Sequence, residues 1–137
     1  MDWGERRIGL AISDPTGLIA SPLPTLTIRG REDGVTRVLA AAKDREAERI
    51  VVGLPLLMSG ERGEAAQSAE LFAQRLREAS SITVEMYDER LTSALSERRL
   101  HETGVRTGHH RERIDAGAAV ALLESFLQRL AARGENG

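Results

Sequence analysis

Residues 49–55 read RIVVGLP, a short run of apolar and β-branched side chains that ends in a glycine and a proline. A run of this kind is typical of a strand that is buried on both faces of a parallel sheet. It is too short for an ordinary helix, and Gly53 and Pro55 are expected to end it at the rim of a cleft. The sequence therefore predicts a central strand here, with helices on both faces of its sheet.

Predicted strands and helices alternate on both sides of this central strand. Ile8–Ser13 has the apolar character of a strand, and turn residues follow it. The prolines of SPLPTLTI at 21–28 favour extended backbone. The other predicted elements are a helix from about Asp33 to Glu48, a helix at Glu64–Ala79, a strand at Ile82–Arg90, a short helix from Ser93 to Gly104 and a long helix at Ile114–Ala132. This order predicts an α/β fold of the RNase H-like type, a mixed central sheet of about five strands flanked by helices.

The length and composition fit one water-soluble domain. The chain has 137 residues, of which 41% are hydrophobic and 29% charged, and we expect a single domain at 1–132 with a flexible tail at 133–137. No apolar run approaches the roughly 18 residues of a membrane span, and no signal peptide is visible. The absence of cysteine excludes disulfides and thiolate metal sites. We therefore expect a cytoplasmic protein with no membrane partner.

Positive charge is concentrated in one stretch, although the formal net charge is −2. Between Arg98 and Arg113 the sequence has five arginines and two glutamates, a local charge of +3. The net charge argues against a uniformly basic surface, but a local patch of this kind is compatible with nucleic-acid binding.

Three acidic stretches occupy positions where an ordinary surface carboxylate is unfavourable. Asp2 adjoins the first apolar run, and Asp115 interrupts the start of an otherwise apolar helix. Asp88 and Glu89 end a predicted strand. Each alone can be explained as a cap, a turn residue or a surface ion pair. Three carboxylates that converge at strand ends repel one another unless cations bind, so together they are candidates for a metal site.

The sequence resembles the YqgF/RuvX family in four blocks that keep their order along nearly the whole chain. They are DWGERRIGLAISDP at 2–15, VVGLPLLMSGERG at 51–63, YDERLTSALSERRL at 87–100 and IDAGAAVALLESFL at 114–127. Members of this family are RNase H-like bacterial proteins described as pre-16S rRNA nucleases or Holliday junction resolvases. The chain departs from the family at Leu57, where asparagine is usual, and ahead of Asp2, where the family has a short apolar strand.

The resemblance implies that Asp2, Glu89 and Asp115 are the catalytic residues and the ligands of Mg²⁺ or Mn²⁺. Two such hard cations, which prefer oxygen ligands, can activate a water molecule and stabilise the leaving oxygen of a phosphodiester. Asp88 is the rival of Glu89 for the second position. Strand alternation puts the two on opposite faces, and we favour Glu89.

Arginines in and near the four blocks are the candidates for contacts with phosphate groups. They are Arg6, Arg7, Arg90, Arg98, Arg99, Arg106, Arg111 and Arg113. Each can also be an ordinary solvated side chain.

The implied function is that of a metal-dependent endonuclease, a hydrolase of ester bonds that acts on structured RNA in the 5′ processing of pre-16S rRNA during ribosome biogenesis. The same carboxylates would also serve a Holliday junction resolvase acting on branched DNA, which cuts two symmetric strands and should be a dimer. A third alternative is a non-catalytic RNA-binding factor in ribosome assembly. The sequence leaves open whether the protein is a monomer or a homodimer.

Overall fold

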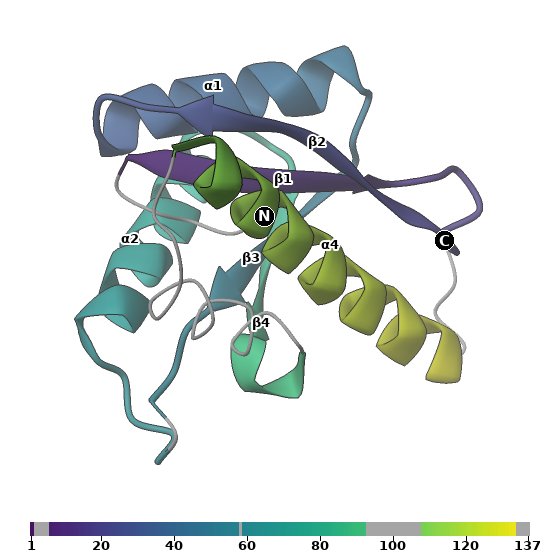
Figure 1. Cartoon of the computed structure of the whole chain (residues 1–137). Coiled ribbons are helices and arrows are strands. Elements are labelled where there is room, and N and C mark those ends of the chain that lie inside the picture. The colour runs from purple at the N-terminus through teal and green to yellow at the C-terminus, as the bar shows by residue number, and fades with distance from the viewer. Residues whose placement is uncertain (2–5, 58, 93–107, 134–137) are drawn as a thin grey trace.

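The computed structural model describes residues 1, 6–57, 59–92 and 108–133, and for residues 108–116 it describes the backbone only. In chain order the elements are β1 (Arg7–Ser13), β2 (Ala20–Thr27), α1 (Arg31–Asp44), β3 (Arg49–Leu54), α2 (Glu64–Ala79), β4 (Thr83–Asp88), the 3₁₀ turn η1 (Glu89–Leu91) and α4 (Gly108–Ala132) (Figure 1). The α/β class is confirmed. None of these helices is both long and apolar enough to cross a membrane, as far as the described residues show.

The described strands form two sheets of two strands each, not the single mixed sheet of about five strands that we expected. β1 and β2 pair antiparallel, and β3 and β4 pair parallel. Within the described residues, Met1 supplies a backbone partner on the other edge of β3. Its amine donates a hydrogen bond to the Val51 carbonyl, and the Gly53 N–H donates to the Met1 carbonyl at 3.1 Å. The predicted single sheet is therefore not seen among the described strands, since the β1–β2 and β3–β4 pairs are not joined by strand hydrogen bonds there.

A cavity of about 850 Å³ lies between these two sheets. Its walls come from the second half of β1, the first half of β3, the end of α1 and the last turns of α4. Met1 lines it as well. The β1–β2 pair and the β3–β4 pair therefore lie on either side of this cavity.

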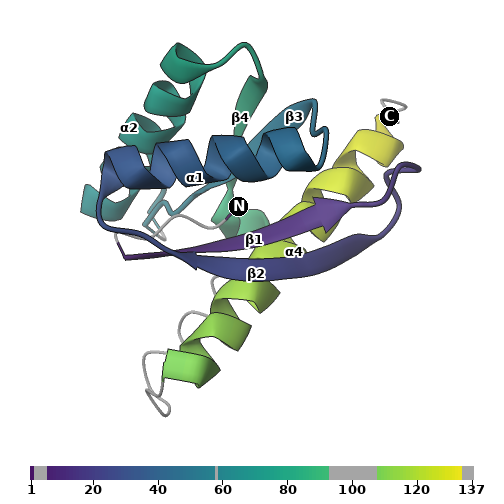
Figure 2. The same ribbon diagram turned by 90° about the horizontal axis from the view of Figure 1, so that it is seen from above.

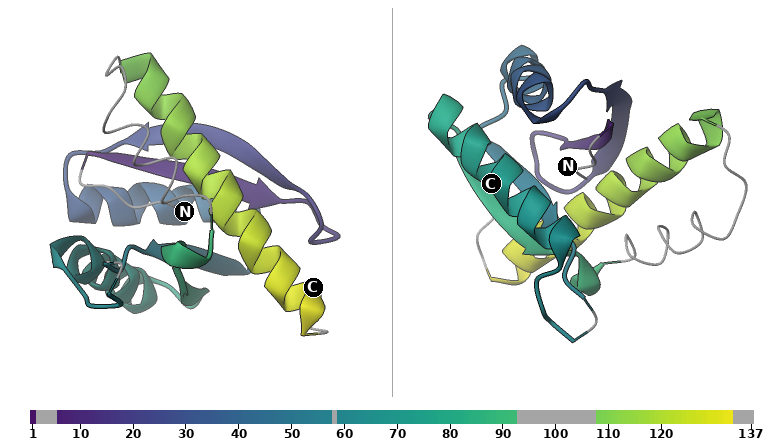
Figure 3. Two further views of the ribbon diagram at one scale, coloured as in Figure 1. Left: turned by 60° about the horizontal axis from the view of Figure 1, so that its bottom comes forward. Right: turned by 90° about the vertical axis from the view of Figure 1, so that its left-hand side faces the viewer.

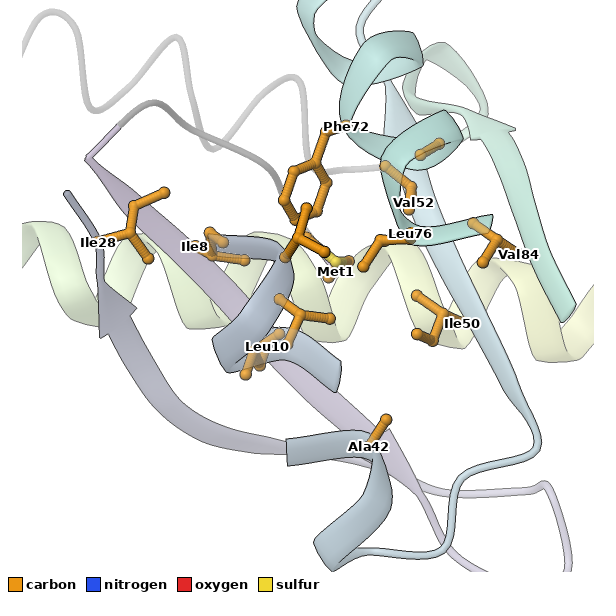
Figure 4. Packing of buried hydrophobic residues seen from close by; sticks show 13 residues of the cluster. Met1, Ile8, Leu10, Ile28, Ala42, Ile50, Val52, Phe72, Leu76 and Val84 are labelled. Carbon is orange, nitrogen blue, oxygen red and sulfur yellow. The ribbon is translucent and has the colours of Figure 1, made fainter. Parts of the chain in front are cut away.

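The apolar residues of β3 alternate between two cores, as a strand buried on both faces requires. Ile50 and Val52 belong to a core that contains side chains of α1 and α2, among them Val38 and Phe72. Figure 4 shows Met1, Ile8 and Leu10 in the same cluster. Val51 faces the other way, into a smaller core with residues of α4. The predicted burial of this strand is confirmed.

Helix α4 runs across the strands on the side away from α1 and α2 (Figure 3). Viewed from above, it crosses beneath β1 and β2 and reaches the neighbourhood of β3 with its later turns (Figure 2). Leu122, Phe126 and Leu130 are its buried residues in the smaller core. They follow each other at intervals of four, so they form one apolar stripe along the helix. This stripe packs α4 against Val51 of β3 and Tyr87 of β4.

Three helix boundaries differ from the prediction, and one of them is the end of α1, which lies at Asp44 and not at Glu48. α4 begins at Gly108 and not at Ile114, because arginine and glutamate are good helix formers even where no apolar periodicity marks the helix. α1 begins at Arg31, two residues before Asp33. Asp33 accepts a hydrogen bond from the Arg29 N–H at 2.9 Å instead of standing at the cap itself. The short helix predicted at 93–104 and most of the predicted tail, 134–137, lie outside the described residues.

Candidate active site

The carboxyl ends of β3 and β4 meet at one edge of their sheet, because the two strands are parallel and in register. Gly53 lies opposite Tyr87, and Leu54 lies opposite Asp88. Beyond Asp88 the chain turns at once into η1, with the Asp88 side chain accepting a hydrogen bond from the Arg90 N–H at 2.9 Å. Because of this turn, the Glu89 carboxyl group lies beside Gly53 of β3 instead of continuing along the direction of β4.

Glu89 is the buried charged residue among the side chains that the structure describes, with 1% of its surface exposed. It continues the alternation of Tyr87, whose ring packs against Phe126 of α4 at 5.7 Å between centroids. Its carboxyl group therefore lies on the α4 side of the sheet. A Cβ atom built on Gly53 would be 2.6 Å from Glu89 Oε2 and 2.6 Å from Leu122 Cδ1. Only glycine at this position leaves room for the carboxyl group beside the helix.

The role of Gly53 is one that the sequence analysis missed, since it assigned this glycine only to the end of the strand. A glycine inside a buried β-branched run is itself a signal, because it often marks the close approach of another group. Here the approaching groups are a side chain from the next parallel strand's end and one from α4.

The surroundings of Glu89 change its acidity. Burial raises the pKa of its carboxyl group to about 7, and the nearby Met1 amine lowers it, while the charge of Asp88 raises it further. Burial in turn lowers the pKa of the Met1 amine to about 5, against the attraction of Glu89. The buried site thus disfavours both charges, and a cation beside Glu89 would favour the ionised carboxylate.

Asp88 has a different environment from its neighbour. Its carboxylate forms an ion pair with Arg90, with Arg90 Nη2 and Asp88 Oδ2 2.8 Å apart and Arg90 Nε 3.0 Å from the same oxygen. The Arg90 guanidinium lowers the pKa of Asp88. The positive charge of Arg90, one of the candidates for phosphate binding, is thereby balanced within the turn.

A hydrogen-bonded link joins this turn to α4. The Tyr87 hydroxyl and Ser125 Oγ are 2.8 Å apart, and Ser125 Oγ donates to the Leu91 carbonyl at 3.2 Å. The end of β4, η1 and the middle of α4 are therefore fixed to one another around Glu89.

The other predicted site residues are less fully placed. Arg6 is exposed just before β1, and Arg7 is the first residue of that strand. Asp115 belongs to α4, but its side chain lies outside the description. Two further candidates, Arg111 and Arg113, share this status, and four others lie outside the described residues altogether: Asp2, Arg98, Arg99 and Arg106.

No cluster of three or more histidine, aspartate or glutamate side chains suited to a metal ion occurs among the side chains that the structure describes. Two of the three predicted ligands are not among those side chains. The three-carboxylate set therefore stays a prediction, of which Glu89 is the member with a known environment.

The sequence matches known proteins along nearly its whole length. Residues 1–129 match the family described as "RuvX: Holliday junction resolvase". A protein of Chloroflexus aurantiacus named "Putative pre-16S rRNA nuclease" is 42% identical over 127 residues, which cover 93% of this chain and 83% of that protein. A protein of Anaeromyxobacter dehalogenans with the same name is 40% identical over 131 residues, 96% of either chain.

The fold also has a counterpart among solved structures. The chain described as "Thermus thermophilus RuvC structure" aligns with a TM-score of 0.53 over 98% of this chain and 95% of that one. The sequences are 17% identical in this alignment, so the likeness concerns the fold alone.

Proposed function

Because the chain belongs to the RuvX family, we propose that it is a divalent-metal-dependent endonuclease that processes the 5′ end of pre-16S rRNA. Family membership makes the chain a hydrolase that acts on phosphodiester bonds. The metal dependence, the rRNA substrate and the site residues are the proposed part. They fit a protein that acts in the cytoplasm during ribosome biogenesis.

The observation that carries the proposal is the buried carboxyl group of Glu89 at the carboxyl end of β4. A carboxyl group that is 1% exposed and has a pKa raised to about 7 is costly as a purely structural element. Carboxyl groups whose pKa is shifted strongly by burial are frequent at catalytic and ligand-binding sites. Its oxygen atoms are the donors that Mg²⁺ and Mn²⁺ prefer.

We assign Asp2, Glu89 and Asp115 as the metal ligands. Bound divalent cations would supply an activated water molecule and stabilise the charge on the leaving oxygen. Glu89 is favoured over Asp88 because Glu89 lies on the side of the sheet that faces α4, the helix to which Asp115 belongs. Asp88 is engaged instead by Arg90 on the outer side of the turn.

Arginines at the surface are proposed to hold the phosphates of the substrate. Arg6 and Arg7 lie at the start of β1, and Arg111 and Arg113 belong to the first turns of α4. Arg90 is the weakest of the candidates that the structure describes, because Asp88 balances its charge. The candidates at Arg98, Arg99 and Arg106 rest on the sequence alone.

A Holliday junction resolvase is the second candidate function, and the description of the matching family favours it. Resolution requires two symmetric incisions and therefore two copies of the site. A protein that is monomeric in solution and cleaves pre-16S rRNA fragments, but not four-way junctions, would exclude this alternative.

The test is a cleavage assay with purified protein on a pre-16S rRNA fragment that carries its 5′ leader and on a four-way DNA junction, with Mg²⁺, Mn²⁺ or EDTA. We expect metal-dependent cleavage of the RNA. Glu89→Gln should lower the cleavage rate by about 100-fold or more, the loss expected when charge stabilisation in the transition state is removed. Glu85→Gln is the matched control, since Glu85 lies on β4, the strand that leads into η1, with an exposed side chain paired to Arg49.

Two other outcomes change the assignment. An inactive Asp88→Asn variant beside an active Glu89→Gln variant would move the ligand by one residue. RNA binding without cleavage under all metal conditions would leave the non-catalytic assembly factor as the better description.

A further inference from the structure

A second basic site lies where β1 begins, β2 ends and α1 starts. It is a pocket of about 640 Å³. Its lining is Arg6, Thr27, Ile28, Arg29, Gly30, Arg31 and Ser68. Three of these seven residues are arginines, all of them with exposed side chains. Of the three, the sequence analysis had singled out only Arg6.

Two acidic residues in the described part of the chain, Glu32 and Asp33, follow the pocket in the first turn of α1, and both are hydrogen-bonded to arginine side chains outside the pocket. Glu32 accepts hydrogen bonds from Arg75 at 2.7 and 2.9 Å, and Asp33 forms an ion pair with Arg37 at 3.1 Å. The Arg75 hydrogen bonds lower the pKa of Glu32, and the Arg29 N–H and then the Arg37 side chain lower the pKa of Asp33, with smaller contributions from the charges of Arg31 and Arg29. Both carboxyl groups are therefore ionised at neutral pH, and each has an arginine side chain outside the pocket as its hydrogen-bonded partner.

The arginines of the pocket therefore contribute an excess of positive charge. Within the described part of the chain, no carboxylate lies within ion-pair distance of the guanidinium groups of Arg6, Arg29 or Arg31. Three exposed guanidinium groups around one pocket attract an anion with several acceptor oxygens.

The backbone at the pocket adds to this preference. Helix α1 starts there, and its N-cap, Gly30, provides no side-chain hydrogen bond to the first turn. The positive end of the helix dipole thus adjoins the three arginines. Gly30 has a φ of 151°, and a Cβ atom at this position would meet nothing within 4 Å, so the turn is open to solvent.

The pocket lies at the same end of the molecule as the candidate active site. α2 begins after the carboxyl end of β3, so Ser68 in its second turn lies toward that end. Figure 1 shows the starts of α1 and α2 on the side toward which β3 runs. The pocket and the carboxyl end of β3 therefore lie on the same side of the molecule.

We propose that Arg6, Arg29 and Arg31 form a phosphate-binding subsite that holds the backbone of the nucleic acid away from the scissile bond. The subsite recognises phosphate groups and not bases, since guanidinium groups and a helix start line it and none of its described lining residues is aromatic. This inference deepens the proposed nuclease function and rests on it for the identity of the ligand.

The test measures binding separately from cleavage. A fluorescently labelled pre-16S rRNA 5′ leader fragment is titrated with protein in EDTA, at salt concentrations from 50 to 300 mM, and binding is followed by anisotropy. The double variant Arg29→Gln/Arg31→Gln should lose two phosphate contacts. We expect the slope of log K against log salt to become shallower by about 1.4, at about 0.7 for each phosphate of single-stranded RNA.

The matched control is the double variant Arg45→Gln/Arg129→Gln. Arg45 follows the opposite end of α1, and Arg129 is an exposed residue near the end of α4. The control variant removes the same net charge from the protein as Arg29→Gln/Arg31→Gln does. An equal change of slope in both variants would therefore mean a general charge effect and would overturn the subsite. An unchanged slope in Arg29→Gln/Arg31→Gln would overturn it as well.

The outcomes for the subsite and for the nuclease are distinguishable. Metal-dependent cleavage by the wild-type protein together with an unchanged salt slope in the variant removes the subsite and keeps the nuclease. If Arg29→Gln/Arg31→Gln binds the RNA more weakly and the control variant does not, while the wild type cleaves under no metal condition, the subsite is kept and the nuclease is removed.

Discussion

The contact between Gly53 and Glu89 can be tested by adding one methyl group. In Gly53→Ala the new Cβ would lie 2.6 Å from Glu89 Oε2 and 2.6 Å from Leu122 Cδ1, whereas ordinary contact begins at 3.4 Å. Leu122 is 0% exposed and Glu89 is 1% exposed, so neither side chain can move toward solvent without breaking the packing around it. The methyl group must therefore displace the carboxyl group, the helix or both.

The cost of such overpacking is about 1–3 kcal/mol in a well-packed core. For a domain of this size each kcal/mol lowers the melting temperature by about 4 °C, so we expect a decrease of roughly 4–12 °C. Displacement of Glu89 should also impair cleavage, since a shift of about 1 Å in a catalytic group can cost about 100-fold in rate. Thermal unfolding followed by circular dichroism and the metal-dependent cleavage assay measure the two effects.

Gly34→Ala is the matched control, a methyl group added to another buried glycine. Its Cβ would lie 3.1 Å from Ile28 Cδ1 and 3.2 Å from Ile8 Cδ1 and Phe72 Cε1. The isoleucine ends can shift by rotation, and the change in a helix interior gains about 0.5–1 kcal/mol of backbone entropy. We expect a melting temperature close to that of the wild type. If Gly53→Ala melts like this control and cleaves at the wild-type rate, Glu89 does not lie against Gly53.

Two further predictions concern the same corner of the fold. The raised pKa of Glu89, about 7 against an ordinary 4.5, means that the folded state loses stability from this group as pH rises through that interval. In EDTA, Glu89→Gln should therefore melt above the wild type at pH 8, by an amount equivalent to roughly 3 kcal/mol. Near pH 4.5 the variant and the wild type should melt at about the same temperature. Equal melting temperatures at both pH values would contradict the burial of an ionisable group. Tyr87→Phe removes the hydrogen bond between the Tyr87 hydroxyl and Ser125 Oγ and should cost about 1 kcal/mol in chemical denaturation. Ser125→Ala also removes the hydrogen bond to the Leu91 carbonyl, so the double variant should lose stability beyond Tyr87→Phe but less than the sum of the two single variants. Full additivity would mean that the Tyr87 and Ser125 side chains do not interact.

Local patterns in the sequence were sufficient to predict most of the elements. RIVVGLP correctly predicted β3, because a short apolar run with β-branched residues is typical of a strand that is buried on both faces. Family membership was likewise confirmed, since four blocks in a fixed order carry much more information than any one of them.

Features that depend on contacts between distant segments could not be predicted in this way. The division of the described strands into two sheets depends on which backbone groups pair with β3, and a local sequence pattern contains no information about this pairing. Strand alternation separated Asp88 from Glu89, but the burial of Glu89 depends on Gly53 and Leu122, far away in the sequence. The basic pocket was missed for the same reason, since Arg6 comes together with Arg29 and Arg31 only through the pairing of β1 with β2.

The buried amine of Met1 has a practical consequence for anything joined to the protein. Met1 is 8% exposed, and Figure 4 shows it among the core side chains. A peptide bond at its nitrogen would keep a donor for the Val51 carbonyl while removing an ionisable group that burial disfavours. Residues joined there would start beside the cavity that Met1 lines together with apolar side chains such as Leu10 and Ile50, where apolar residues are better suited than a charged tag. A fusion at this end is in effect a substitution in the core, and its sequence has to be designed like one.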